Sequence, residues 1–288
     1  MGLTDELILR LAASRNLARA GMADLQNFLT VGSDASSGFR LTATAGNPSL
    51  KPAISDNFDA SLEWYFATVG SLTFNAYYKN IHNFFYQDIT FRDITSNGVT
   101  QSVQVRGPAN FEGTGKVKGF ELAYQQTYEF LPAPLDGLGI SANYSFINSE
   151  GLPNSLLNTG EPVDVPLDGG VPGNLPLEQL SKHNVNVAAF YEKGPISIRG
   201  AYNWRSRFLL TAADVIFPFY PILNDATGQL DASVFFSLNE NVKVGVQGVN
   251  LTNEVTRTLQ QFSSDGLLGP RSYFMNDRRF AFIVRGTF

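Results

Sequence analysis

A period-two alternation of apolar and polar side chains runs through nearly the whole 288-residue sequence. Successive side chains of an extended chain point to opposite faces, so each alternating segment has one apolar and one polar face. The pattern is typical of β-strands and predicts an all-β protein. The alternating segments lie at 5–16, 58–66, 72–79, 120–130, 138–146, 184–192, 196–205, 230–238 and 278–288.

The connections between these segments alternate strictly between short and long. Short connections lie at 67–71, 130–137, 192–195 and 238–241. Long connections lie at about 16–54, 85–115, 149–183, 207–228 and 252–277. This alternation predicts ten strands in five up-and-down units, with every long loop at the same end. Long irregular loops are uncommon in compact domains, so five of them at one end require a special architecture.

The first segment is the most ambiguous part of the pattern. The stretch TDELILRLAASRNLARAGMADL is rich in Leu, Ala and Arg, which are good helix formers, and it could form an amphipathic helix. Alternation also holds there, with Leu7, Leu9, Leu11 and Ala13 on one face. Because ten strands require it, we interpret 5–16 as a strand.

Two architectures fit such strands. In a soluble sandwich the apolar faces of two sheets would pack together, whereas in an outer-membrane barrel they would face lipid and the polar faces would line a lumen. Strand lengths of about 10 to 14 residues and the loop asymmetry favour the barrel. Aromatic residues near strand ends, such as Tyr144, Trp204 and Phe130, match interfacial girdles. The sequence therefore predicts an antiparallel up-and-down transmembrane β-barrel with short periplasmic turns and long extracellular loops.

Composition excludes several other classes of protein. No stretch approaches the roughly 18 to 20 consecutive apolar residues of a membrane-spanning helix. The absence of Cys excludes thiol catalysis, disulfides and Cys-based zinc sites. A net charge of -5 gives no basic footprint for nucleic acid.

Several recognisable motifs follow one another along the chain. The first is GNPSLKPAISDNFDASLEWYF (46–66), a loop that leads into a descending strand, and the second is GKVKGFELAYQQ (115–126), a strand start. The later ones are NYSFINSE (143–150), YNWRSRF (202–208), GQLDASVFFSL (228–238), GVNLTNE (248–254) and the terminal RRFAFIVRGTF. In this order and spacing, the motifs resemble the carboxy-terminal part of TonB-dependent outer-membrane receptors, in which an acidic residue is common at the position of Ala53.

The resemblance implies a location and a transport function. A full receptor would be a 22-stranded barrel in the outer membrane of a Gram-negative bacterium, with a plug domain and a TonB-interacting segment ahead of it. Residues 1–288 would be the carboxy-terminal part of that barrel, a single domain and a fragment, without plug or TonB box. The receptor would take up a scarce nutrient (iron-siderophore, cobalamin or carbohydrate) with energy from the TonB complex. It would have no enzymatic activity, cofactor or metal site.

Two alternatives remain open from the sequence. The chain could be a small self-contained outer-membrane barrel acting as a pore or an enzyme, or a soluble β-sandwich binding module. An outer-membrane protease would need acidic residues and a His at the rim, where Asp56, Asp59, His82 and Asp88 could be neighbours. His82 and His183 are the only histidines, and we interpret both as ordinary polar loop residues.

The lumen would carry charged side chains. The candidates are Arg10, Lys79, Arg199, Arg205 and Arg285, which could bind an anionic solute. Pairing with Glu63, Glu121, Glu129 and Asp231 on neighbouring strands is the simpler expectation, because lumen charges are normally compensated.

The long loops carry aromatic residues that could stack on a ligand or pack the loops together. The candidates for ligand contact are Tyr86, Phe91, Phe217, Phe219, Tyr220, Phe262 and Tyr273. Ser96–Asn97–Gly98 predicts a hairpin turn within the 85–115 loop. The acidic, Gly- and Pro-rich stretch 164–176 is more typical of a flexible lid than of a calcium site.

The terminal strand alternates up to the last residue. Phe280, Phe282, Val284 and Phe288 would face lipid, with Arg285 on the lumen side. By resemblance, this strand would be the signal that the barrel assembly machinery reads, so deleting Phe288 should reduce membrane assembly of the intact receptor.

Overall fold

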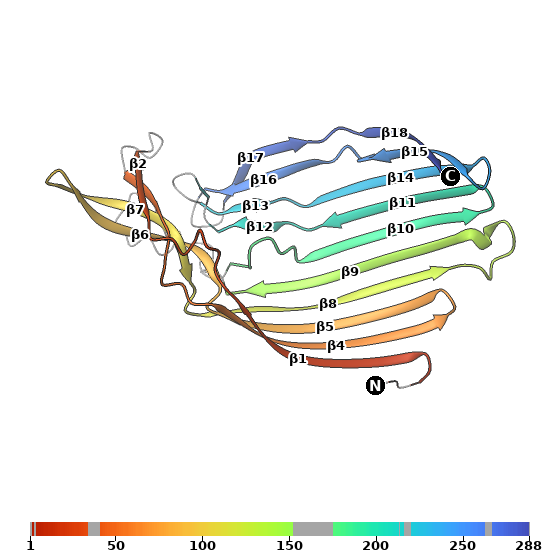
Figure 1. The fold of residues 1–288 in the computed structure, drawn as a ribbon, viewed down its shortest axis with the longest axis horizontal. Coiled ribbons are helices and arrows are strands. Elements are labelled where there is room, and N and C mark those ends of the chain that lie inside the picture. Colours follow the sequence, from red (N-terminus) through yellow and green to blue (C-terminus); the bar gives the residue numbers. More distant parts are fainter. Residues whose placement is uncertain are drawn as a thin grey trace.

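One antiparallel sheet of ten strands dominates the fold (Figure 1). The structure is a computed structural model and describes residues 2, 4–33, 41–151, 175–212, 214–215, 220–262 and 267–287. Each strand pairs with the next strand of the sheet in sequence order, so the predicted up-and-down topology is confirmed. The segment predicted as a strand at 5–16 does form a strand and not a helix, with observed bounds Leu7–Ala18. In sheet order the strands are β1 (Leu7–Ala18), β4 (Ala53–Ala67), β5 (Gly70–His82), β8 (Thr114–Thr127), β9 (Leu138–Glu150), β10 (His183–Lys193), β11 (Ile196–Arg205), β14 (Thr227–Ser237), β15 (Val242–Val249) and β18 (Arg279–Gly286).

The strand register divides the sheet into an apolar face and a polar face. Residues directly opposite one another in antiparallel strands share a face. Leu62, Phe74 and Leu122 are opposite one another on β4, β5 and β8, and all three side chains are exposed. On the polar face, the same kind of register aligns Asn143 with Asn186 on the next strand. A row of exposed apolar side chains along a whole sheet cannot be a protein core, so this face requires a partner other than water.

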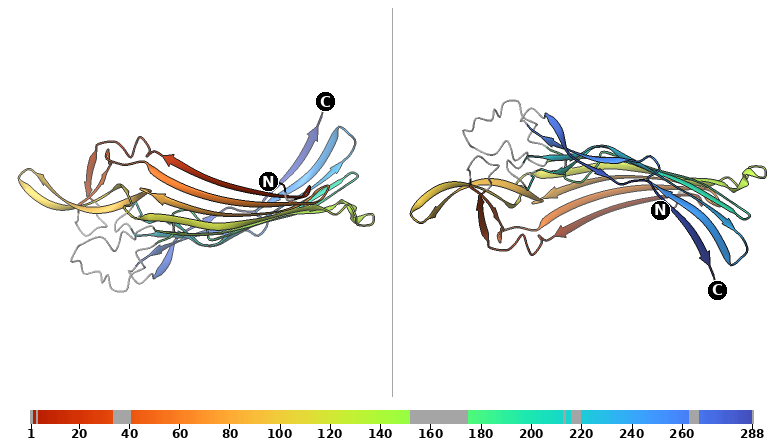
Figure 2. Two further views of the ribbon diagram at one scale, coloured as in Figure 1. Left: turned by 90° about the horizontal axis from the view of Figure 1, so that it is seen from below. Right: turned by 90° about the horizontal axis from the view of Figure 1, so that it is seen from above.

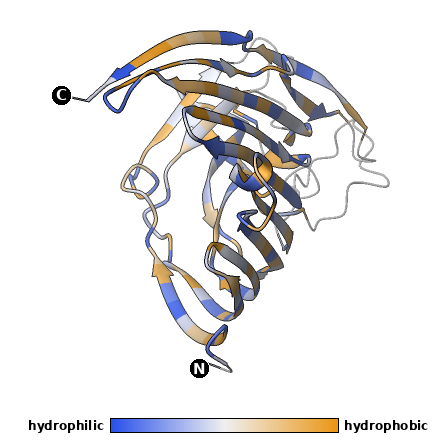
Figure 3. Ribbon diagram, turned by 90° about the vertical axis from the view of Figure 1, so that its right-hand side faces the viewer, coloured by the Kyte–Doolittle hydropathy of each residue, from blue (hydrophilic) through white to orange (hydrophobic). Residues whose placement is uncertain are grey.

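The sheet curves into an open trough (Figures 2 and 3). Strands β1 and β18 are the two edge strands of the sheet, and within the described residues neither pairs with a further strand on its outer side. The two termini lie at opposite ends of the arc in Figure 3. The ten strands therefore form one curved layer and not two packed sheets, which removes the sandwich alternative.

Aromatic side chains on the polar face cover glycines of neighbouring strands. Tyr77 is directly opposite Gly119, and a Cβ at position 119 would lie 2.8 Å from the Tyr77 hydroxyl oxygen. Phe190 lies in the same way over Gly139, and Phe235 over Gly245. An aromatic ring over a strand glycine restores the contacts that the missing side chain would have made. These three aromatic–glycine pairs favour the observed strand register, because a shift would place a larger side chain under each ring.

The long connections are more ordered than the sequence predicts, because they carry two small sheets of their own at one end of the trough. We call this end the loop end. One small sheet contains β2 (Leu29–Ser33), β3 (Leu41–Ala45), β6 (Phe85–Ser96) and β7 (Val99–Asn110), and the other contains β12 (Phe208–Thr211), β13 (Ile222–Asn224), β16 (Val255–Gln261) and β17 (Leu268–Met275). The hairpin predicted at Ser96–Asn97–Gly98 is confirmed, since β6 and β7 meet at Asn97 and Gly98, both with positive φ.

The second small sheet extends the trough. Its order, β12-β13-β16-β17, repeats the order β11-β14-β15-β18 of the strands that lead into it. The short connections lie at the other end, which we call the turn end, and include a 3-10 turn at Leu135–Gly137. No described helix has the length and apolar content needed to cross a membrane.

Buried apolar clusters gather at the loop end. One consists of Phe84, Leu175, Leu209 and Ala212, and the other of Ala43, Ala45, Val103 and Val105. Among the described residues the ten-stranded sheet has no second layer, so it buries few apolar side chains between protein elements. The loop end is thus the compact part of the molecule, above a trough whose polar face stays accessible.

Candidate functional site

The cluster around Phe84 ties separate loops into one assembly. Phe111 packs against Phe84 at a centroid distance of 5.0 Å, and against Tyr86 edge-on at 6.2 Å. Burial, followed by the nearby Asp88 carboxylate, raises the pKa of Tyr86 to about 12. Tyr86, a candidate for ligand contact, therefore packs within the loop assembly.

A buried carboxylate, Asp214, holds the connection between β12 and β13. Asp214 is only 3% exposed, and its carboxylate Oδ2 lies 2.8 Å from the guanidinium group of Arg271 on β17. Its other oxygen, Oδ1, accepts the backbone N–H of Val215 at 2.7 Å. The Gln260 amide approaches Oδ2 at 3.5 Å. Buried charges need this kind of pairing, because desolvation of a lone carboxylate is expensive.

Arg106 of β7 brings a second cation to the same region. Burial lowers its pKa, and the charges of Glu178 and Asp214 oppose that shift. Glu178 accepts the backbone N–H of Ala212 at 2.6 Å. Arg106, Glu178, Asp214 and Arg271 thus form a charge-balanced cluster, which we call the loop-end ionic cluster. It joins the β6–β7 hairpin, the segment before β10, the β12–β13 connection and β17.

Arg205 is the last residue of β11, at the loop end of the polar face. Its guanidinium lies 3.8 Å from the centroid of the Phe208 ring, a cation–π contact. Its Nε donates to the Ser181 hydroxyl at 2.8 Å, and its terminal nitrogen reaches the Gln179 carbonyl at 3.4 Å. Arg205 is thereby held against the loop assembly.

A cavity of about 540 Å³ lies on the polar face under the loop end. Leu177 and Leu180 form part of its apolar wall, while Lys79, Glu121 and Asp59 supply charge. A mixed lining of this kind can hold a ligand by burial and orient it by a few polar groups.

A second cavity, of about 420 Å³, lies further toward the turn end. Asn143, Asn186 and Asn203 form a row of amides across three adjacent strands along its floor, and Arg199 adds one positive charge. The Asn186 amide donates to Asn143 Oδ1 at 2.7 Å. This surface presents hydrogen-bond donors and acceptors together, which suits a polar solute or a polypeptide backbone.

The predicted polar-face cations occupy separate places on the trough. Arg10 pairs with Glu63 at 2.8 Å, as the pairing interpretation expects. Lys79 lies 5.7 Å from the Tyr77 centroid, and Arg285 lies 4.9 Å from that of Phe235. They stand on β1, β5 and β18, so the structure does not bring them together into one anion site.

The remaining aromatic candidates are also dispersed. Phe91 and Tyr220 are half-buried, and the Tyr220 carbonyl accepts the N–H of Asp214 at 3.1 Å. The exposed Phe262 lies over Gly269, and Tyr273 of β17 is exposed. Phe217 and Phe219, like the stretch 164–174 and Phe288, lie outside the described residues.

Each histidine has one close polar side-chain neighbour in the described part of the chain. His82 is 3.2 Å from the Asn80 amide, and His183 Nδ1 is 2.8 Å from the Tyr144 hydroxyl. No group of three or more His, Asp or Glu that could hold a metal occurs among the described residues. By the alternation of β4, Asp56 and Asp59 point to opposite faces, so the acidic group proposed for a protease does not assemble.

The loop-end ionic cluster is the feature that the sequence did not predict. Its four members come from four connections that are remote in sequence, and no local pattern links them. The amide row, in contrast, follows from the predicted alternation once the register is known.

Comparison with known proteins supplies the family context. Residues 2–251 match the model of the TonB dependent receptor-like beta-barrel. No curated protein matches the chain. The ferric enterobactin receptor PfeA from Pseudomonas aeruginosa is similar in structure (TM-score 0.65, 14% identity, 99% of this chain and 39% of that chain). The siderophore receptor PirA from Acinetobacter baumannii (0.59, 11%, 99% and 40%) and the copper transporter OprC (0.59, 13%, 100% and 38%) are also similar. The chain spans about two fifths of the length of these proteins.

Proposed function

Because the chain belongs to the TonB-dependent receptor family, we propose that it forms part of the barrel of a receptor that imports a scarce nutrient across the outer membrane. The family is one of transport receptors and not of enzymes, and it belongs to the outer membrane of Gram-negative bacteria. In this proposal the apolar face contacts lipid and the polar face lines the lumen. Energy would come from the TonB complex, through a plug domain inside the barrel.

This proposal rests on the difference between the apolar and the polar face of the ten-stranded sheet. The apolar face exposes large side chains such as Phe74, Trp64 and Phe282. In water this surface would be an aggregation hazard, whereas in a bilayer it is the surface that a strand must present. The outer edges of β1 and β18 would pair with further barrel strands, because lipid cannot satisfy the hydrogen bonds of exposed backbone N–H and C=O groups.

The nutrient would enter through the loop end. Iron-siderophore complexes are the first class to test, since PfeA and PirA are siderophore receptors, and cobalamin and carbohydrate follow. Exposed Phe262 and Tyr273 would offer contact surfaces, and the cavity holding Lys79 and Glu121 would lie on the path below. Phe91, Phe217, Phe219 and Tyr220 remain candidates for contact.

The test uses the protein in its complete natural reading frame. Detergent-extracted receptor should migrate faster on gels when unheated than when boiled, and a water-soluble, heat-insensitive monomer would reject the membrane placement. Binding titrations should then compare ferric siderophores, cobalamin and oligosaccharides. Uptake of the ligand that binds should stop in a host lacking TonB, and continued uptake would reject the energy coupling.

A further inference from the structure

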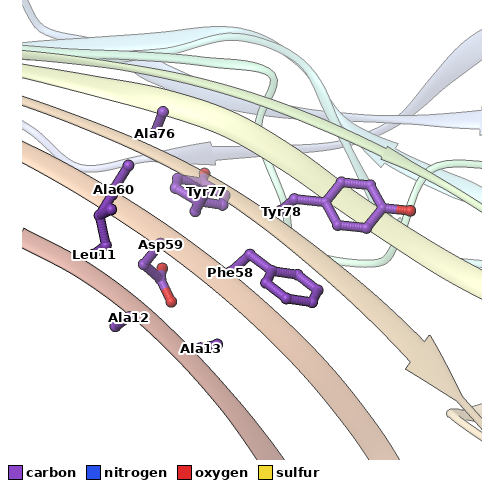
Figure 4. A pocket seen from close by; sticks show the side chains of 9 residues that line it. All are labelled: Leu11, Ala12, Ala13, Phe58, Asp59, Ala60, Ala76, Tyr77 and Tyr78. Carbon is purple, nitrogen blue, oxygen red and sulfur yellow. The ribbon is translucent and has the colours of Figure 1, made fainter.

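The apolar face carries a groove across the middle of β1, β4 and β5 (Figure 4). Two rows of side chains on β1, β4 and β5 flank it: Leu11 with Ala60 and Ala76, and Ala13 with Phe58 and Tyr78. The row between them, Ala12, Asp59 and Tyr77, points to the opposite face, so its backbone forms the floor. The groove has a volume of about 670 Å³ and a mostly apolar lining. The three alanines leave the space, while the Phe58 and Tyr78 rings form a wall.

Basic side chains stand beside this groove on the same face. Lys118 of β8 is directly opposite Tyr78, the residue that ends the groove wall. One row closer to the loop end, Lys116 lies on β8, which borders the groove, and Arg15 lies on β1, which helps to form it. All three side chains are exposed. β1 and β8 are three strand spacings apart, or about 14 Å, since neighbouring strands lie about 4.8 Å apart.

Two of these cations have acidic neighbours, and one does not. Arg15 pairs with Asp56 at 2.5 Å, and Lys116 is opposite Glu150 in the register. Lys118 is opposite Tyr78 and Asn148, and it takes part in no salt bridge among the described residues. The positive charge nearest the groove is therefore available to an external anion.

An apolar groove with cations at one end matches an amphiphile that has an anionic head. Aliphatic chains would lie along Ala60 and Ala76, and a phosphate would meet Lys118. Lysine stems can run over apolar surface while the ammonium group reaches the headgroup layer. Because the cations lie on the loop-end side of the groove, the matching lipid belongs to the outer leaflet.

We propose that this groove, with Lys116 and Lys118, binds the phosphorylated glycolipid of the outer leaflet. This inference rests on the membrane placement given under Proposed function. The lipid's acyl chains fill the groove over Ala60 and Ala76, and one phosphate accepts hydrogen bonds from the Lys118 ammonium group. Such a lipid would brace β1, β4, β5 and β8 from outside, opposite the cavity that contains Lys79.

The test titrates delipidated receptor, in its complete reading frame, with diphosphoryl lipid A and follows binding by native mass spectrometry. The variant K116A/K118A should bind about 30-fold more weakly, because each basic residue near an anionic headgroup contributes about a fivefold change. K116R/K118R should restore binding. A60F, which fills the groove and keeps both charges, should weaken binding about tenfold through lost acyl-chain burial. K243A removes an exposed lysine from the other face and should bind like the parent.

Any other outcome rejects either the binding site or the proposed lipid. Unchanged binding in K116A/K118A, or equal binding of lipid A without its phosphates, would overturn it. Stronger binding of phosphatidylglycerol than of lipid A would reject the glycolipid as occupant. Variants that remain heat-modifiable in the membrane but bind normally reject this inference alone, whereas a receptor absent from the membrane rejects both proposals.

Discussion

Tyr77 of β5 lies across Gly119 of β8 on the polar face, with no room between them for a side chain at position 119. A Cβ there would lie 2.8 Å from the Tyr77 hydroxyl oxygen and closer still to the Phe146 carbonyl oxygen. The ring can move, but the carbonyl belongs to the backbone of β9. The glycine in the KGFEL stretch is thus required by close packing across three strands.

Replacing Gly119 with Ala should destabilise the barrel by about 1–3 kcal/mol, the usual cost of overpacking. The measurement is the urea midpoint of refolding into detergent for the complete receptor. Gly200 of β11 gives the matched control, because a Cβ there meets no atom within 4 Å. G200A should leave the midpoint nearly unchanged, and equal losses in both variants would contradict this explanation.

The ionic cluster predicts a local effect at the loop end. D214N removes the partner of Arg271 and should cost about 3 kcal/mol or more locally, because breaking a buried pair leaves an uncompensated charge. Hydrogen exchange should show lost protection in β12, β13 and β17. The exposed pair Arg207–Asp225, at 2.8 Å, serves as comparison. D225N should cost less than about 1 kcal/mol, and similar effects of the two substitutions would reject the buried role of Asp214.

Asp88 predicts a pH dependence of the β6–β7 hairpin. Burial raises the pKa of its carboxyl above the ordinary value, although the Ile89 N–H and the Tyr86 hydroxyl oppose that shift. A folded pKa above the unfolded one means that the folded state binds the proton more tightly. Stability should therefore rise as pH falls from above the folded pKa toward the ordinary Asp pKa of about 3.9.

Hydrogen exchange of the hairpin amides, corrected for intrinsic rates, measures this effect. Protection should increase on acidification in the parent, and D88N should remove that increase. D93N changes an exposed carboxylate on the same strand and should retain it. Protection that falls with pH in the parent, or an unchanged slope in D88N, would show that Asp88 does not control the hairpin.

The ten long strands are predictable because period-two alternation is a local property of each strand. Leu72 and Phe74 show their common face without any knowledge of β8. The small sheets are different: β13 has three residues, Ile222–Asn224, and pairs with β16 more than 30 residues later. The parallel pairing of β3 with β7, Ala43 with Val105, joins residues that are even further apart in the sequence. Such short strands are set by tertiary pairing, and the sequence pattern is too brief to reveal them.

The candidate site likewise has one part that the sequence predicts and one part that it does not. The amides Asn143 and Asn186 follow from alternation plus register, so strand prediction nearly finds them. Asp214 and Arg271 gain their role only when two loops fold together. An acidic residue in a loop looks solvated in the sequence, and only burial shows that its charge must be matched.

The face assignment itself can be tested within one strand, β18. Phe282 lies on the apolar face, opposite Val246, and Ala281 lies on the polar face, opposite Gln247. If the apolar face contacts lipid, F282R should destabilise the complete receptor in membranes by about 2–4 kcal/mol at mid-depth. A281R introduces the same charge one residue away and should cost much less, because its side chain enters a polar interior. The measurement is the denaturant midpoint in lipid vesicles. A larger loss of stability for A281R than for F282R would show that the lipid-facing and lumen-facing sides are assigned the wrong way round.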